Sequence, residues 1–240
     1  MKKDIYIIKT GTTFPGLKDT LGDFDLWTLN SMGLGIDDVI ITDAEHGDPL
    51  PFPGACTGVV ITGSHSMVTE HLQWSEDLLK WIPEIIDRKV PFMGICYGHQ
   101  LLAQAMGGEV GYHLKGKEIG TVKINLLPES EDDPLFGSMT SGFYAHVTHS
   151  QSIITPPDCA VTLACNDFEQ HHAIRIGPCA WGLQFHPEYS TDIMKSYILN
   201  QADELEKAGH DTAELVKGVR ETAEASETMK IFTGLIMKRQ

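Results

Sequence analysis

A cysteine framed by two glycines is the feature of this sequence best suited to covalent chemistry. Cys96 lies in Gly94-Ile95-Cys96-Tyr97-Gly98, between an apolar run and a segment whose apolar residues have helical spacing. This is the cysteine form of the Gly-x-Ser-x-Gly pattern, in which a nucleophile occupies a strained turn between a strand and a helix. Unpaired N–H groups at the start of that helix favour a thiolate. We therefore predict a nucleophile rather than a buried structural cysteine.

A nucleophilic cysteine needs a base, and His186 has suitable neighbours. It lies in the run GLQFHPE (182–188), directly after a predicted strand and 90 positions beyond Cys96. Glu188 can orient the imidazole and stabilise its charged form, as the third member of a triad does. Pro187 fixes its own φ and favours an extended His186. We predict a triad of Cys96, His186 and Glu188; an exposed turn without chemistry is the alternative for the His-Pro-Glu segment alone.

The elements that must position these groups alternate along the first half of the chain. The run GVVITG (58–63) is apolar without alternation, as expected of a strand buried on both faces. Helices between consecutive strands indicate crossover units and a parallel sheet. The fold class we predict is α/β, with one domain and a mostly parallel central sheet flanked by helices. The predicted strands are 5–8, 39–42, 59–62 and 91–95, and the predicted helices are 17–32 and 74–86.

Shorter β-like runs follow between residues 121 and 186, separated by proline and glycine, and we expect hairpins added to the sheet. Cys159, Cys165 and Cys179 lie in these runs and are expected in the core. After Ser190 the sequence is helical in character. We predict a domain over residues 1–200 and a helical extension over 201–240, packed on the outside of that domain or used as a homo-oligomer contact.

Composition argues against several classes of protein. The chain has 18 Lys and Arg against 33 Asp and Glu, a net charge of −15, whereas nucleic-acid partners are held by clustered basic residues. No stretch approaches the roughly 18 apolar residues of a membrane helix, so no membrane is expected. Five widely spaced cysteines and no secretory signal argue against a disulfide framework. We expect a cytoplasmic protein.

Two further patterns approach known sites without completing them. Residues 111–118 almost spell a phosphate-binding P-loop, but Glu118 occupies the place of the Ser or Thr that binds magnesium. A carboxylate there would repel phosphate, so we expect a surface loop. His146 and His149 have regular spacing, yet no cysteine or carboxylate completes a zinc signature. We expect neither a metal nor an organic cofactor.

Together the segments GICYGHQLLAQAMGGEV (94–110) and GLQFHPE (182–188) resemble the class I glutamine amidotransferases, and especially the amidotransferase domain of GMP synthases. Their order and separation are similar to those of the family, and the resemblance covers about residues 39–195. It implies a flavodoxin-like fold and a Cys96-His186-Glu188 triad. The implied reaction is attack of the thiolate on the side-chain amide of glutamine, followed by hydrolysis of a thioester.

The resemblance also implies further contacts. Gly63-Ser64 stands where the family has a Gly-Gly-Pro loop, without the second glycine and the proline. The implied oxyanion hole uses an N–H of this loop, best Ser64 and otherwise Gly63, together with the N–H of Tyr97. The implied glutamine contacts, for which polar residues satisfied within the fold are the alternative, are Gln100, His149 and Ser150. Ser150 and Gln151 replace a Gly and an Asp of many relatives, and Lys115 or Lys117 is expected near the site.

Three functions are compatible with these residues. The first is a glutaminase that supplies ammonia to a synthase subunit on another chain. The second is a stand-alone hydrolase of γ-glutamyl peptides or amides, which the altered oxyanion loop and the Ser150-Gln151 pair keep open. The third is a non-catalytic regulatory relative, which the intact triad disfavours. The sequence does not identify the nitrogen acceptor.

Overall fold

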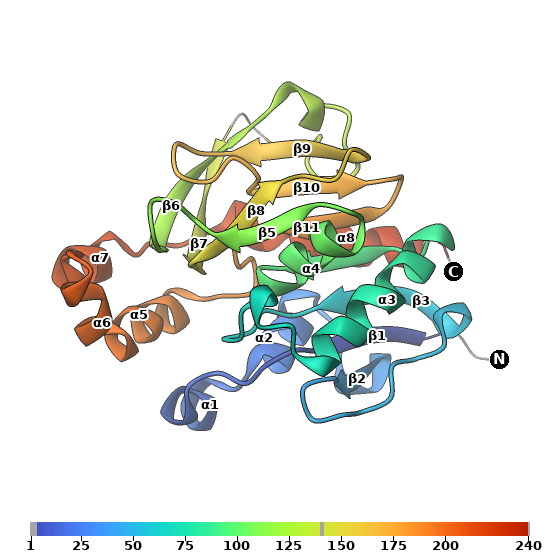
Figure 1. Cartoon of the computed structure of the whole chain (residues 1–240), viewed down its shortest axis with the longest axis horizontal. Helices are drawn as coiled ribbons and strands as arrows, with labels where there is room; N and C mark the ends of the chain where they lie inside the picture. Colours follow the sequence, from blue (N-terminus) through green and yellow to red (C-terminus); the bar gives the residue numbers. More distant parts are fainter. Residues whose placement is uncertain (1–3, 140–141, 240) are drawn as a thin grey trace.

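A nine-stranded sheet forms the centre of the computed structural model, which describes residues 4–139 and 142–239 (Figure 1). Its strand order is β2-β1-β3-β4-β11-β10-β9-β6-β7. The parallel strands are β2 (Val39–Asp43), β1 (Asp4–Lys9), β3 (Cys56–Ile61), β4 (Phe92–Ile95) and β11 (Ala180–Leu183). The antiparallel strands are β10 (Ala173–Ile176), β9 (Ala160–Cys165), β6 (Glu118–Leu126) and β7 (Gly142–His149).

Helices cover both faces of this sheet. The side chains of β3 alternate between two cores, with Val60 facing one and Val59 and Ile61 the other, and all three are fully buried. One core includes residues of α3 (Gln73–Asp87) and α4 (Tyr97–Ala105), and the other includes residues of α8 (Ala223–Met237). The predicted α/β class with a flanked, mostly parallel sheet is confirmed.

The single helix predicted over 17–32 is wrong, because the chain forms α1 (Pro15–Leu21) and α2 (Phe24–Ser31). Gly22 ends α1 with a φ of 88°, a left-handed value that glycine adopts readily. Asp23 then accepts the N–H of Phe24 at 2.9 Å and caps α2. A glycine followed by a capping residue therefore divides one apolar pattern into two helices.

The second half contains the predicted hairpins and one strand that joins the parallel group. β11 pairs antiparallel with β10, yet it also pairs parallel with β4, placing Leu183 beside Ile95. Two strands, β5 (Glu109–Tyr112) and β8 (Gln151–Thr155), form a separate antiparallel pair. The connections between these elements also contain short 3-10 helices, which are η1 (Ile36–Asp38), η2 (Pro53–Ala55), η3 (Val68–Glu70) and η4 (Pro128–Ser130).

The chain after β11 forms four helices with two different locations. The first three, α5 (Thr191–Asn200), α6 (Ala202–Lys207) and α7 (Thr212–Gly218), extend away from the sheet near β6 and β7 (Figure 1). α8 instead buries Met229, Phe232 and Ile236 completely in the main core. The last helix therefore packs on the same domain and covers part of the sheet, and a boundary near residue 200 stays a prediction.

Surface features agree only in part with the sequence. Of the three cysteines expected in the core, Cys179 is buried, Cys165 is partly exposed and Cys159 is exposed, because the last lies in the turn before β9.

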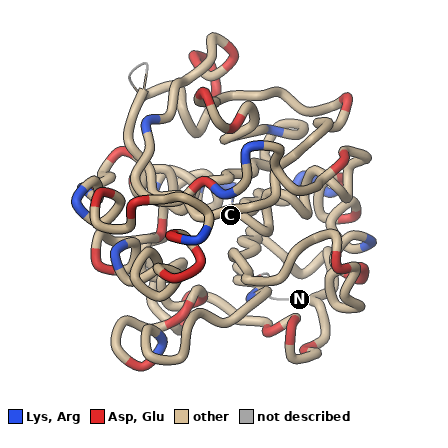
Figure 2. Tube along the Cα trace, turned by 60° about the vertical axis from the view of Figure 1, so that its left-hand side comes forward, with Lys and Arg blue, Asp and Glu red and all other residues tan. Residues whose placement is uncertain are grey.

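Acidic positions outnumber basic ones along the trace (Figure 2). Among the described residues, no helix combines the length and apolarity that crossing a bilayer requires.

Candidate active site

The turn between β4 and α4 has the geometry expected of a nucleophile elbow. Cys96 has φ 49° and ψ −96°, an unfavourable backbone conformation for a residue with a side chain. A Cβ on Gly94 would lie 2.3 Å from the carbonyl oxygen of Gly98, and one on Gly98 would lie 2.5 Å from that of Ile61. Both glycines are therefore required by close backbone approach, and the strained turn presents the cysteine at the sheet's edge.

His186 and Glu188 form a buried pair directly after β11. The Nδ1 of His186 lies 2.8 Å from Oε1 of Glu188, and the Nε2 has no hydrogen-bond partner among the described residues. Burial lowers the pKa of His186, but the charges of Glu188 and Cys96 more than offset it, and the pKa rises to about 10. The ring of Tyr189 stacks on the imidazole with centroids 4.0 Å apart. His186 is thus held as a charged imidazole with one nitrogen available.

The topology brings the cysteine and this pair together. β4 and β11 are adjacent and parallel, so the residues that follow them meet at the same edge of the sheet. Cys96 and His186 line one cavity of about 330 Å³. Gly63 lies against both: a Cβ there would be 3.0 Å from Cε1 of His186 and 3.8 Å from Cβ of Cys96. The three residues predicted as a triad therefore occupy one site.

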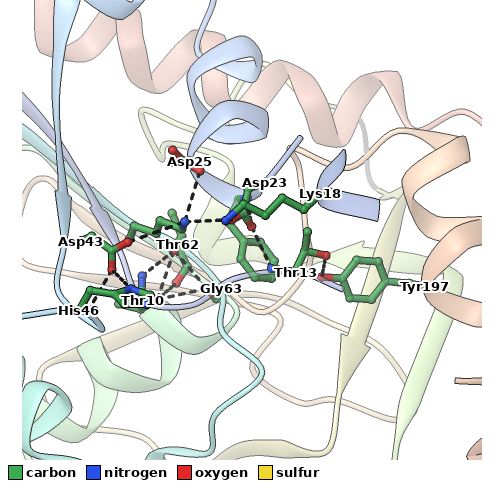
Figure 3. Close-up of polar contacts among 12 residues, drawn as sticks. Thr10, Thr13, Lys18, Asp23, Asp25, Asp43, His46, Thr62, Gly63 and Tyr197 are labelled. Atoms are coloured by element: carbon green, nitrogen blue, oxygen red, sulfur yellow. Dashed lines mark hydrogen bonds and ion pairs between the residues drawn. The ribbon is translucent and has the colours of Figure 1, made fainter. Parts of the chain in front are cut away.

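The predicted oxyanion loop at Gly63-Ser64 is fixed by hydrogen bonds from Thr10, which directly follows β1. Thr10 donates its backbone N–H to Oγ1 of Thr62 at 3.1 Å and its hydroxyl to the carbonyl of Gly63 at 3.1 Å (Figure 3). Ser64 donates no backbone hydrogen bond to any residue in 4–139 or 142–239. Tyr97 is the first residue of α4, where an N–H has no partner within the helix. Both N–H groups are compatible with an oxyanion hole, and their role stays a prediction.

The predicted glutamine contacts lie at the site, but most of their polar atoms are already bonded. Gln100 donates to the carbonyl of Gln151 at 2.8 Å and to Oε1 of Gln184 at 3.0 Å. His149 contacts the Gln151 carbonyl through Nδ1 at 3.0 Å and Glu118 through Nε2 at 3.0 Å. Ser150 lines the cavity. Gln100 and His149 therefore agree with the alternative of groups satisfied within the fold, while contact with a substrate remains untested for all three.

The residues of the P-loop-like segment (111–118) lie in three different environments. Leu114 is fully exposed, which confirms a surface loop. Lys115 donates to the carbonyl of Asp167, whereas Lys117 lines the cavity with Cys96. Glu118 is buried, and the imidazoles of His149 and His172 lie 3.0 Å and 3.3 Å from its Oε2. Burial opposes the charge on this carboxyl, yet these imidazoles hold the pKa of Glu118 well below its usual range.

Sequence reasoning missed most of the cavity wall. Tyr197 of α5 contacts Oγ1 of Thr13 at 2.9 Å and Nε2 of His65 at 3.1 Å, which ties this helix to the loop after Ser64. Phe14 packs against His65 with ring centroids 4.6 Å apart. No short motif marks these aromatic residues, because they come from three distant segments.

The two histidines considered for metal have other partners. Nδ1 of His146 lies 3.0 Å from the hydroxyl of Thr121, and both nitrogens of His149 are engaged. Among the described residues, the only group of three or more His, Cys, Asp or Glu with ligand atoms within 4.8 Å of one another is Asp43, Glu45 and His46, at the end of the edge strand β2.

Comparison with known proteins gives a consistent result. Gamma-glutamyl peptidase 5 of Arabidopsis thaliana is 29% identical over 169 residues, which cover 70% of this chain and 67% of the relative. One subunit of the glutamine-hydrolyzing GMP synthase of Methanopyrus kandleri is 30% identical over 156 residues, covering 62% of this chain and 79% of that subunit. The crystal structure of a glutamine amido transferase from Methylobacillus flagellatus shares the fold, with a TM-score of 0.78 at 22% identity over 99% of this chain and 95% of that one. A family model described as glutamine amidotransferase class-I matches residues 39–205. The chain belongs to the class-I glutamine amidotransferase family.

Proposed function

We propose that this protein hydrolyses the side-chain amide of glutamine through a thioester on Cys96. The observation that carries the proposal is the shared cavity of Cys96, on its strained turn, and His186, whose Nδ1 is held by Glu188. A charged imidazole beside a cysteine favours the thiolate, which is the reactive form of the nucleophile. The same imidazole can then deliver a proton to the leaving nitrogen.

The reaction divides into two halves. The Cys96 sulfur attacks the γ-carbonyl carbon, and the N–H groups of Ser64 and Tyr97 stabilise the negative oxygen. His186 gives its proton to the nitrogen, the carbon–nitrogen bond breaks and ammonia leaves. Water then attacks the thioester while His186 takes a proton, which releases glutamate and restores the thiolate.

The released ammonia has a proposed destination outside the chain. The similarity to one subunit of a GMP synthase supports transfer to a synthase subunit on another chain. The helices α5 to α7 extend from the sheet beside the active-site edge and offer a contact for such a partner or for a second copy of this chain (Figure 1).

One observation favours a second candidate, the hydrolysis of γ-glutamyl peptides or amides without ammonia transfer. The cavity of about 330 Å³ that Cys96 and His186 line is far larger than ammonia requires. A molecule the size of water needs only about 10–15 Å³ of such volume. The similarity to a gamma-glutamyl peptidase supports this candidate independently.

The test is covalent labelling with a glutamine-mimicking electrophile, followed by mass spectrometry, together with assays of ammonia release from glutamine. We expect one label on Cys96 and no turnover by Cys96→Ala. Ammonia release by Cys96→Ala equal to that of the wild type would exclude catalysis at this site. Parallel assays with γ-glutamyl peptides separate the two candidates.

A further inference from the structure

Cys96 lines two hollows of different size, and the wall formed by residues 148–150 is common to both. The smaller, of about 30 Å³, reaches Tyr97, Gln100 and Gln151. The larger, of about 330 Å³, contains His186 and extends to α5 and α6. The leaving nitrogen must lie beside His186 to receive its proton. The part of the larger hollow beside His186 is therefore on the leaving-group side of the thioester.

The larger hollow contains a single basic side chain other than histidine among the described residues that line it, and this is Lys117. Its ammonium donates to the side-chain oxygen of Gln201, at the start of α6. No described carboxylate forms an ion pair with it. The one carboxylate in the lining, that of Glu204, belongs to an exposed residue at the rim.

The charge of Lys117 is unusual in its setting. The whole chain has a net charge of −15, which would repel an anionic substrate unless the site supplied a local positive field. Burial lowers the pKa of Lys117, and the charges of Glu204 and Cys96 only partly offset this effect. An anionic group of the substrate would compensate the partly buried ammonium, because a hydrogen bond between two opposite charges is stronger than the existing one from the ammonium to a neutral amide.

Lys115, in the same loop as Lys117, lies outside the cavity. Two positions earlier in the same loop, Lys115 donates to the carbonyl of Asp167, and its ammonium lies 5.6 Å from the centre of the Phe168 ring. It does not line the larger hollow. The two lysines therefore provide a matched pair, one inside the site and one outside it.

We propose that Lys117 binds a carboxylate on the leaving group, so that the preferred substrates are γ-glutamyl amides of amino acids. This inference rests on the proposed thioester chemistry at Cys96. The amide carbon–nitrogen bond breaks as the carbon–sulfur bond forms, and the nitrogen takes the proton of His186. The amino acid then leaves with its carboxylate on Lys117, and water hydrolyses the glutamyl thioester.

The experiment compares γ-glutamyl-alanine with γ-glutamyl-alanine amide, which has nearly the same size but no carboxylate. For the wild type we expect kcat/KM to favour the free acid by about 10- to 100-fold, the range of one hydrogen bond to a charged group. Lys117→Gln should reduce this ratio to within about threefold, chiefly through KM, and Lys117→Arg should retain most of it. Lys115→Gln should keep the wild-type ratio.

Each outcome supports or overturns a defined claim. Equal cleavage of the two substrates by the wild type, or an unchanged ratio in Lys117→Gln, would overturn the carboxylate subsite. If Cys96 is labelled and glutamine is hydrolysed while neither peptide is cleaved, the inference fails and the proposed function survives. If Cys96 is not labelled and no substrate is cleaved, both fail. The thermal unfolding temperature of each variant shows that a lost ratio does not come from a lost fold.

Discussion

Two buried imidazole–carboxylate pairs lie at the same active site and differ in whether both ring nitrogens are bonded. In the first pair Nδ1 of His186 lies 2.8 Å from Glu188, and in the second Nε2 of His149 lies 3.0 Å from Glu118. Both imidazoles are almost completely buried, and both line the cavity with Cys96. Distance and burial alone therefore do not distinguish them.

The second nitrogen of each ring makes the difference. In His149 it contacts the carbonyl oxygen of Gln151, which can only accept a hydrogen. The other nitrogen of His149 is engaged by the Glu118 carboxylate, so neither nitrogen of this ring is left for a substrate. In His186 the second nitrogen has no hydrogen-bond partner among the described residues. A pair of this kind acts as a base only when one nitrogen is left unbonded.

Removal of the available nitrogen should have the largest effect. We expect His186→Gln to lower kcat by at least about 10³-fold, because a triad fails when its base is lost. Ammonia release from glutamine at saturating concentration measures this loss. His149→Gln is the matched variant: it should lose stability in urea denaturation, and its activity per folded molecule should fall far less. A larger loss of kcat in His149→Gln would reverse the roles assigned to the two rings.

Replacement of Glu188 should have the next largest effect and should depend on pH. Glu188→Gln removes the charge that contributes most to the raised pKa of His186. The imidazole then loses its orienting and stabilising partner, so we expect kcat to fall by about 10²- to 10⁴-fold. The folded pKa of about 10 exceeds the ordinary 6.5, so the stability gained from the charged imidazole is complete below about pH 6.5. It is lost as the pH rises toward 10.

Urea denaturation across pH 6 to 10.5 measures this dependence. The wild type should be more stable than Glu188→Gln at pH 6, and the difference should shrink steadily as the pH rises. A difference that grows with pH would show that His186 is not held in its charged form by Glu188.

Replacement of Glu118, the partner of His149, should lower the stability of the fold more than the rate of catalysis. Glu118→Leu leaves the buried imidazole of His149 without its carboxylate, and breaking a buried pair costs about 3–5 kcal/mol of unfolding free energy. Glu118→Gln keeps an acceptor oxygen and should lose less. Urea denaturation at neutral pH gives both values. A loss below about 1 kcal/mol in Glu118→Leu would mean that His149 does not depend on this carboxylate.

The sequence was most informative where the chemistry is local. The glycines around Cys96 predict a sharp turn and the His-Pro-Glu segment predicts an imidazole–carboxylate pair, and the structure contains both. That Cys96 is the nucleophile stays a prediction. The two segments meet because β11 joins the parallel strands beside β4, which the hairpin interpretation did not predict. That pairing depends on packing across the whole sheet, so a short pattern does not contain it.

The sequence could not distinguish the two histidines by residue type. His149 is fixed by Glu118, which is 31 positions away on the paired strand β6, and by a backbone carbonyl that carries no sequence signal. The same reason applies to Lys115 and Lys117, which look equivalent in sequence and point to different neighbours. Sequence predicts which groups are present, whereas the contacts decide which of them remain available.

The smallest expected effect tests whether the position of His186, rather than its charge, limits catalysis. A Cβ on Gly63 would lie 3.0 Å from Cε1 of His186, so Gly63→Ala must move the ring by a few tenths of an ångström. Small displacements of a catalytic group are costly, and we expect kcat to fall by about tenfold with little change in the pH dependence. Gly16→Ala is the control, because a Cβ there meets no atom within 4 Å. Full activity in Gly63→Ala would show that catalysis tolerates a small displacement of the His186 imidazole. The unbonded nitrogen of this ring would then matter more for kcat than its exact position.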